Sequence, residues 1–265
     1  MANKIKITAV NYLNTLPFKY GMIKLGHLLS WADINYATPA ECAQMLIDKK
    51  TNIALAPVAV LVKQPDLKVV TNYCLSTNDV VKSVKLYSHK PIQKIETIVL
   101  DYQSLSSVSL IKVLMRYYWK KEVRYIQGIK GFEKQLKEDA MLVIGDRTFE
   151  LNGTFPYEYD LAEEWFKFYG KPFVFAAWIS NLELDEEKID TLNQIFEYGI
   201  KHIDEVIEDA ILSISFLKHI DVDTKRYFIS SYLKNNMQYL LTQDRENSMQ
   251  HFLNLLKTLE TEKVL

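Results

Sequence analysis

Three serines at the start of an expected helix are the first residues whose type and spacing could do chemistry. Ser104, Ser106 and Ser107 lie between an apolar run and a stretch of helical periodicity. The run covers residues 95–100 and the periodic stretch residues 108–118, which predicts a strand, a turn and a helix. The first N–H groups of a helix have no partner within it, and the helix dipole adds partial positive charge there. The hydroxyls could therefore cap the helix or help its N–H groups to hold an anion such as a carboxylate.

Four further candidates follow two expected strands. Tyr12 and Asn14 come after the first apolar–polar alternation of the chain. Pro57 and Val58 come after a short apolar run, where a second helix N-terminus could face a cleft. Open α/β sheets bind ligands just beyond the carboxyl ends of their strands. All four residues are therefore candidate ligand contacts, although Asn14 could equally serve only as a helix cap.

Two other polar residues have ambiguous roles. Ser83 is expected in the middle of a strand at residues 81–87, where a serine is usually structural. Asp146 follows a buried run at residues 140–144 and could be a base, or only a turn or cap residue. The five histidines and two cysteines show no metal-ligand spacing, and no phosphate loop or dinucleotide fingerprint is present. We therefore expect no metal and no cofactor.

Composition restricts the partners of this chain. It has 265 residues, of which 48% are hydrophobic and 25% charged, and a formal net charge of −1, typical of a globular protein with a large core. Because Lys and Arg are spread along the chain, we expect neither nucleic acid nor an anionic membrane as a partner. The N-terminal residues lack a signal-peptide pattern, and no apolar run is long enough to span a membrane. With Cys42 and Cys74 expected as free thiols, we predict a cytoplasmic protein.

The elements that would position these residues alternate between strand and helix. The pattern Thr38-Pro39-Ala40-Glu41 predicts a helix capped by Thr38. A strand, a helix and a strand in this order imply a parallel pair with a crossover. Strands are expected at residues 5–10, 52–56, 69–75, 81–87, 95–100, 140–144 and 173–179. Helices are expected at residues 39–49, 108–118, 131–138, 160–170, 185–203, 224–233 and 246–259.

This layout predicts an α/β protein of two lobes, with a central cleft and C-terminal helices. We expect a discontinuous first lobe at residues 1–88 and 180–265, and a second lobe at residues 89–179. The chain would pass between the lobes at hinges near Ser88 and Ser180.

The predicted cleft would bring candidates from both lobes together. Asn14 and Ser83 would come from the first lobe, and the serines at 104–107 and Asp146 from the second. A closed cleft would then hold a small anion by helix ends and hydroxyls, without lysines or a metal.

Seven short segments, spread over most of the chain, form a recognisable pattern. They are 10–17 (VNYLNTLP), 53–59 (IALAPVA), 81–84 (VKSV), 100–107 (LDYQSLSS), 144–146 (IGD), 159–161 (YDL, with Trp165) and 172–178 (PFVFAAW). In this order they resemble the MqnA family, the chorismate dehydratases of the futalosine route to menaquinone. Each segment alone is weak, but together they are specific.

The resemblance implies a fold like that of the type II periplasmic binding proteins. It also implies a small dicarboxylate substrate, chorismate, which would be dehydrated to 3-[(1-carboxyvinyl)oxy]benzoate and water without a cofactor. Asn14 and Ser83 are implied as the catalytic positions. The residues expected to contact the substrate are Tyr12, Pro57, Val58, Ser104, Ser106, Ser107 and Asp146.

Neither implied catalytic side chain is a good base at neutral pH, because one is an amide and the other a hydroxyl. We therefore expect one of the substrate's own carboxylates to take the ring proton while Asn14 and Ser83 hold it in place. Positioning of this kind contributes about 7–11 kcal/mol at best. Asp146 is the alternative base.

The chain departs from the family pattern at a few positions. Asn11 stands where the family has a serine, and Ser106 stands where it has a threonine. The turn Asn78-Asp79-Val80 replaces a Gly-Pro type turn. Arg147 and Tyr169 replace smaller residues. These changes affect the loop before Ser83 and the rim of the cleft, and therefore fine specificity more than reaction class. Two other functions stay open: a non-catalytic cytosolic solute-binding or sensor protein, or a later enzyme of the pathway that acts on cyclic dehypoxanthine futalosine.

Overall fold

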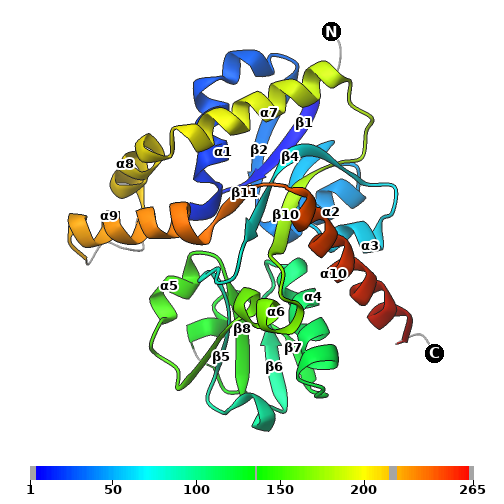
Figure 1. The fold of residues 1–265 in the computed structure, drawn as a ribbon, viewed down its shortest axis with the longest axis vertical. Helices are drawn as coiled ribbons and strands as arrows, with labels where there is room; N and C mark the ends of the chain where they lie inside the picture. The colour runs from blue at the N-terminus through cyan, green and yellow to red at the C-terminus, as the bar shows by residue number, and fades with distance from the viewer. Residues whose placement is uncertain (1–3, 135, 215–219, 263–265) are drawn as a thin grey trace.

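The computed structural model describes residues 4–134, 136–214 and 220–262, which form two α/β lobes (Figure 1). The first lobe is built on a six-stranded sheet, and the second lobe on a five-stranded sheet. In spatial order the first sheet consists of β11 (Gln238–Leu240), β4 (Lys68–Thr77), β10 (Phe173–Ser180), β3 (Ile53–Pro57), β1 (Ile5–Val10) and β2 (Ala32–Ala37). The second consists of β7 (Arg124–Gln127), β6 (Thr97–Leu100), β8 (Ala140–Ile144), β5 (Val84–Ser88) and β9 (Tyr157–Asp160).

Both sheets are mixed. Strand β1 pairs in parallel with β2 and β3, as the predicted crossover requires. Strand β6 likewise pairs in parallel with β7 and β8. Strands β10 and β5 are antiparallel to their neighbours, and each lies in a segment that enters its lobe from the other one.

Helices cover the sheets and join the lobes. The α-helices are α1 (Leu16–Lys24), α2 (Pro39–Ile47), α3 (Val60–Lys63), α4 (Ser106–Val113), α5 (Arg147–Leu151), α6 (Leu161–Tyr169), α7 (Glu186–Lys201), α8 (Ile203–Ser213), α9 (Val222–Ser231) and α10 (Gln243–Glu262). Short 3₁₀ turns are η1 (Leu13–Thr15), η2 (Gly26–Leu29), η3 (Ile92–Lys94) and η5 (Phe132–Lys134), and π turns are η4 (Leu114–Tyr118) and η6 (Tyr232–Asn236). The red helix α10 in Figure 1 packs against β10 and α3 of the first lobe and α4 of the second.

Several helix ends follow from local sequence. Thr38 and Glu41 form the predicted capping box at the start of α2. The carboxylate of Asp160 accepts N–H groups at the start of α6, and Gly170 ends that helix at a φ of 74°. Only a residue without a Cβ adopts this left-handed conformation at little cost.

Helices α1 and α7 approach each other unusually closely at two glycines. A Cβ on Gly199 would lie 1.8 Å from the carbonyl oxygen of Pro17, and one on Gly21 would lie 2.0 Å from that of Ile195. The contact holds the start of α1 against the body of the first lobe, directly after the segment that carries Asn14.

The passages between the lobes differ from the predicted hinges. Strand β5, which ends at Ser88, pairs with β8 and β9 of the second sheet, so residues 84–88 belong to the second lobe. Strand β10, which ends at Ser180, pairs with β3 and β4 of the first sheet. The chain therefore crosses at residues 78–83 and 170–172. The predicted hinges lie at the far ends of β5 and β10, one strand away from these crossings.

Two local predictions were wrong. Ser83 lies just before β5 and not in the middle of a strand, because Lys82 has a left-handed φ of 64° that interrupts the extended run. The helix predicted at residues 131–138 is only the turn η5 at Phe132–Lys134, and residue 135 lies outside the described residues.

Candidate functional site

A cavity of about 60 Å³ lies between the two lobes. It receives side chains from the segment after β1, the passage at residues 78–83, the turn before α4, and β10. Its lining residues are Val10, Tyr12, Asn14, Pro39, Pro57, Leu75, Val81, Ser83, Val84, Ser104, Ser106, Ser107, Ile144, Gly145, Phe175, Ala176 and Met237. No charged side chain is among them, so within the described residues the polar groups of this cavity are hydroxyls, one amide and backbone groups.

The three serines Ser104, Ser106 and Ser107 have different hydrogen-bond partners. The Ser104 hydroxyl accepts the N–H of Ser107 at 3.1 Å and thus caps α4. The Ser106 hydroxyl accepts the N–H of Ala59 across the cleft at 3.2 Å. The Ser107 hydroxyl lines the cavity and has no hydrogen-bond partner among the described residues. Ser104 therefore serves as the predicted helix cap, and the Ser107 hydroxyl is free to donate to a ligand.

Pro57 lines the cavity, but Val58 does not. The Val58 side chain is fully buried in the core, and its N–H donates to the carbonyl oxygen of Phe175 at 3.1 Å. The predicted contact of Val58 with a ligand stays a prediction. The helix that follows, α3, is a single turn, and its contribution to the cleft is the N–H of Ala59.

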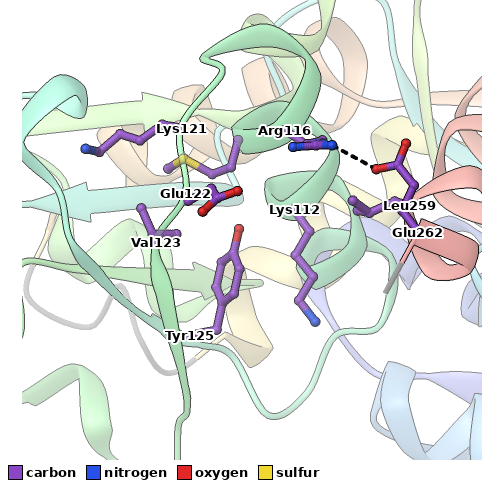
Figure 2. A pocket seen from close by; sticks show the side chains of 9 residues that line it. Lys112, Arg116, Lys121, Glu122, Val123, Tyr125, Leu259 and Glu262 are labelled. Carbon is purple, nitrogen blue, oxygen red and sulfur yellow. Dashed lines mark hydrogen bonds and ion pairs between the residues drawn. The ribbon is translucent and has the colours of Figure 1, made fainter. Parts of the chain in front are cut away.

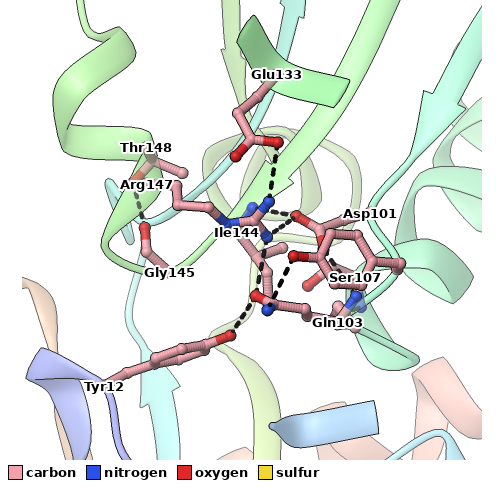
Figure 3. Close-up of polar contacts among 11 residues, drawn as sticks. Tyr12, Asp101, Gln103, Ser107, Glu133, Ile144, Gly145, Arg147 and Thr148 are labelled. Carbon is pink, nitrogen blue, oxygen red and sulfur yellow. Dashed lines mark hydrogen bonds and ion pairs between the residues drawn. The ribbon is translucent and has the colours of Figure 1, made fainter. Parts of the chain in front are cut away.

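Tyr12 reaches across the cleft to the second lobe (Figure 3). Its hydroxyl donates to Gln103 Oε1 at 2.7 Å, and Gln103 Oε1 also accepts from Arg147 Nη2 at 3.0 Å. The backbone carbonyl of Gln103 accepts the N–H of Ala40 at the start of α2, at 3.0 Å. Burial, and then the nearby Asp101 carboxylate, raise the pKa of Tyr12 well above its usual value, so its hydroxyl remains a donor.

Arg147 and Asp101 lie beside Gln103 in the second lobe, and Arg147 contacts both residues (Figure 3). The guanidinium of Arg147 donates to Asp101 Oδ2 at 2.6 Å and forms an ion pair with Glu133 at 3.3 Å. Burial raises the pKa of Asp101, and Arg147 opposes that shift. Sequence reasoning marked Arg147 as a departure but missed Gln103 and Asp101, whose roles depend on contacts between distant segments.

Asp146 is not a lining residue of the cavity. Its two carboxylate oxygens lie 3.2 and 3.4 Å from the backbone nitrogen of Leu13, which donates to them from the other lobe. Burial raises the pKa of Asp146 to about 6, and the hydrogen bond from Leu13 opposes the shift. In this structure the carboxylate therefore forms a contact between the lobes, and its predicted contact with a substrate stays a prediction.

Asn14 and Ser83 meet at a residue that the sequence did not single out, Tyr232. The Tyr232 hydroxyl donates to Ser83 Oγ at 2.8 Å. Burial raises the pKa of Tyr232 far above its usual value, while Ser83 and Asn14 lower it. The side-chain oxygen of Asn14 is buried and has no hydrogen-bond partner among the described residues. In sequence, Tyr232 has the helical spacing of an ordinary core residue, and this is why it was missed.

Buried polar groups hold the loop that carries Ser83. Asp160 caps α6 and also accepts the N–H groups of Val81 and Lys82, at 3.3 and 2.6 Å. Burial raises the pKa of Asp160 to about 6, and these hydrogen bonds lower it. Arg245 donates to the side chain of Asn78 at 2.7 Å, so this departure from the family pattern has a partner in α10.

Tyr169 lies away from the cleft, contrary to the expectation that it alters the rim. Its ring stacks on His251 of α10 with centroids 3.9 Å apart, and it is not a lining residue of the cavity. Both predicted free thiols, Cys42 and Cys74, are buried and unbridged.

A larger hollow of about 410 Å³ lies between α4, the segment before β7, and α10 (Figure 2). Lys112, Arg116 and Lys121 line it, but Glu122 and Glu262 line it too. Arg116 donates to Glu262 at 3.1 Å. None of the predicted site residues faces this hollow, so the candidate site remains the smaller cavity in the cleft.

Comparison with known proteins identifies the family. The sequence model of a family described as menaquinone biosynthesis matches residues 5–258. The chain belongs to the menaquinone biosynthesis family. A curated relative is the chorismate dehydratase of Thermus thermophilus, which is 25% identical over 219 residues, or 74% of this chain and 80% of the relative. The family resemblance read from the sequence is thereby confirmed.

Solved structures share the fold of this family member at low sequence identity. A protein from Archaeoglobus fulgidus superposes with a TM-score of 0.72 at 10% identity, covering 100% of this chain and 99% of that one. The periplasmic aliphatic sulphonate binding protein of Escherichia coli superposes with a TM-score of 0.59 at 11% identity, covering 98% and 94%. The predicted two-lobed fold of the periplasmic-binding-protein type is confirmed. None of the described helices has both the length and the apolar character needed to cross a bilayer.

Proposed function

We propose that this protein is a chorismate dehydratase that acts in the cytoplasm and converts chorismate to 3-[(1-carboxyvinyl)oxy]benzoate and water. The family and the curated relative support a role in menaquinone biosynthesis. The observation that carries the specific reaction is the cavity itself. It joins Asn14 and Ser83 of the implied catalytic pair to the serine-rich start of α4, without any charged side chain in its lining.

The arrangement suits a substrate that carries its own charges. One carboxylate would lie against the start of α4, where the Ser107 hydroxyl and the helix dipole favour an anion. The second would lie near Asn14 and Ser83, which line the same cavity. Tyr12 and Pro57 would contact the ring between them.

The proton acceptor that we propose is a carboxylate of the substrate. Asn14 and Ser83 are not basic, and Asp146 faces Leu13 outside the cavity. The elimination breaks the bond to the ring hydroxyl and the bond to the neighbouring ring hydrogen. The carboxylate first receives that proton. The proton then combines with the departing hydroxide, and together they form the released water. Aromatisation of the ring provides the thermodynamic drive.

The direct test is to mix the purified protein with chorismate and follow the loss of diene absorbance together with formation of the benzoate product. We expect turnover by the wild-type protein and a fall in kcat of at least about 100-fold in Ser83→Ala, because a donor to the developing charge is lost. A matched control is Ser109→Ala, which removes a buried serine hydroxyl on α4 that does not line the cavity. If chorismate is bound but unchanged, the protein is a binding protein and the proposal is wrong.

The fold neighbours favour one alternative, a non-catalytic cytosolic protein that binds a small solute, since one of them is a periplasmic binding protein. A later pathway enzyme that acts on cyclic dehypoxanthine futalosine is the other alternative, and the segments at residues 12–14 and 172–178 favour the dehydratase over it. Incubation with that compound in the same assay separates this alternative from the proposed function.

A further inference from the structure

Tyr232 lies directly behind the cavity, at the first residue of η6. Its side chain is 1% exposed, and its ring packs edge-on against Phe149 with centroids 5.1 Å apart. The turn η6 contacts η1, which carries Asn14, and the hydroxyl of Tyr232 reaches Ser83 Oγ at 2.8 Å. The buried phenol thus binds Ser83 directly and belongs to a turn that contacts the segment carrying Asn14.

The direction of this hydrogen bond follows from what each hydroxyl can reach. A hydroxyl has one hydrogen to donate. Among the described residues, Ser83 Oγ is the one acceptor found for the hydrogen of Tyr232. Ser83 lines the cavity, and no described residue accepts the hydrogen of its hydroxyl. Both hydrogens are used only if Tyr232 donates to Ser83 and Ser83 donates to a ligand.

We propose that Tyr232 is a positioning residue, which holds the Ser83 hydroxyl so that its hydrogen points into the cavity toward the departing hydroxyl of the substrate. This inference rests on the proposed dehydration. Without Tyr232, the Ser83 hydroxyl would rotate freely and donate to the substrate in only part of its orientations. A donor that is fixed in advance stabilises developing charge without the cost of reorganisation.

Tyr232 acts here as a fixed donor and not as a proton relay. Burial, the largest influence on its pKa, disfavours the phenolate, and the carboxylates of Asp146 and Asp160 add to this effect. The phenol therefore keeps its proton throughout the reaction. Ser83 contributes a hydrogen bond only, and the atoms of the released water come from the substrate.

The test is a double-mutant cycle with Tyr232→Phe, Ser83→Ala and the combined variant. Tyr232→Phe keeps the ring and removes one oxygen. We expect its kcat for chorismate to fall about tenfold, with KM changed less than about twofold, since one oriented hydrogen bond is lost. In the Ser83→Ala background the same change should have no further effect on kcat, because Tyr232 acts through Ser83.

Tyr239→Phe is the matched control. Tyr239 is also buried, at 6% exposure, and its hydroxyl has no partner among the described residues. We expect this variant to keep the wild-type kcat. Thermal unfolding provides a second readout: Ser83→Ala leaves the Tyr232 hydroxyl without an acceptor, so adding Tyr232→Phe should raise the melting temperature of that variant.

Two results overturn the inference while the proposed function stands. One is a wild-type kcat in Tyr232→Phe, and the other is an independent, multiplicative loss in the double variant. A wild-type protein that does not turn over chorismate overturns the proposed function and this inference together.

Discussion

Two buried aspartates near the cleft hold backbone segments together through hydrogen bonds. Asp146 and Asp160 accept backbone N–H groups, and neither has a basic side chain as a hydrogen-bond partner among the described residues. Burial raises the pKa of each from 3.8 to about 6. Each carboxylate therefore connects segments that carry site residues, and each makes the folded state sensitive to pH near 6.

The sign of this sensitivity is set by the raised pKa values. Between pH 3.8 and about 6 the folded state binds more protons than the unfolded state, so the stabilising contribution of Asp146 is complete at low pH and is lost as pH rises. We expect Asp146→Asn to make the fall in unfolding free energy between pH 4 and pH 7 shallower, by up to about 3 kcal/mol. Urea denaturation at these two pH values measures the change. The exposed Asp66→Asn serves as control, and an equal slope in both variants would contradict the prediction.

At the scale of elements, the site depends on how tightly α1 is held. This helix begins immediately after the turn η1 that carries Asn14, and it meets α7 at Gly21 and Gly199 with no room for a side chain. The glycines are required by the contact and not by a special backbone angle. The position of Asn14 is therefore coupled to packing on the outer face of the first lobe.

We expect Gly199→Ala to destabilise the protein by about 2–4 kcal/mol, because its Cβ would overlap the Pro17 carbonyl and force the helices apart. Gly26→Ala is the control, since a Cβ there meets nothing within 4 Å. Thermal and urea unfolding of both variants provide the comparison. Equal stability of the two would show that the α1–α7 contact can relax freely.

At the scale of the whole molecule, the two lobes are closed over the cavity. Backbone and side-chain hydrogen bonds cross the cleft at Tyr12–Gln103, Ala40–Gln103, Leu13–Asp146 and Ala59–Ser106. A ring-sized ligand needs these contacts to open before it can enter the cavity. The passages at residues 78–83 and 170–172 are where the chain would bend.

Gln103 takes part in two of these contacts, with Tyr12 through its side chain and with Ala40 through its backbone carbonyl. Removing its side chain therefore breaks one contact across the cleft and keeps the other. We expect Gln103→Ala to raise KM for chorismate about tenfold, because the closed form loses the acceptor shared by Tyr12 and Arg147. The unliganded variant should also show a larger radius of gyration in small-angle X-ray scattering. Gln93→Ala, on the exposed surface of the second lobe, is the control. An unchanged KM and radius would show that other contacts alone keep the lobes closed.

Most of the fold could be predicted from local patterns, and the site could be predicted in part. Asn14, Ser83 and the serines at 104–107 were expected in one cleft, and the structure places them in one cavity. Their catalytic and binding roles stay predictions. The predicted hinges were wrong because the sequence pattern of a long strand is the same whichever of the two sheets the strand pairs with. Val58 and Asp146 were also expected to contact the substrate, and this stays a prediction. In the structure the Val58 side chain is buried in the core, and Asp146 accepts the N–H of Leu13.

By itself, the sequence determined features that depend on residues close together in the chain. The alternating strands, the capping box at Thr38 and Glu41, and the serine-rich start of α4 are of this kind, because periodicity and capping act over a few residues. Only the tertiary structure decided what surrounds Ser83. Tyr232 lies 149 residues away from it in sequence, and Asp160 lies 78 residues from Lys82. Such contacts depend on the path of the whole chain, which no local pattern contains.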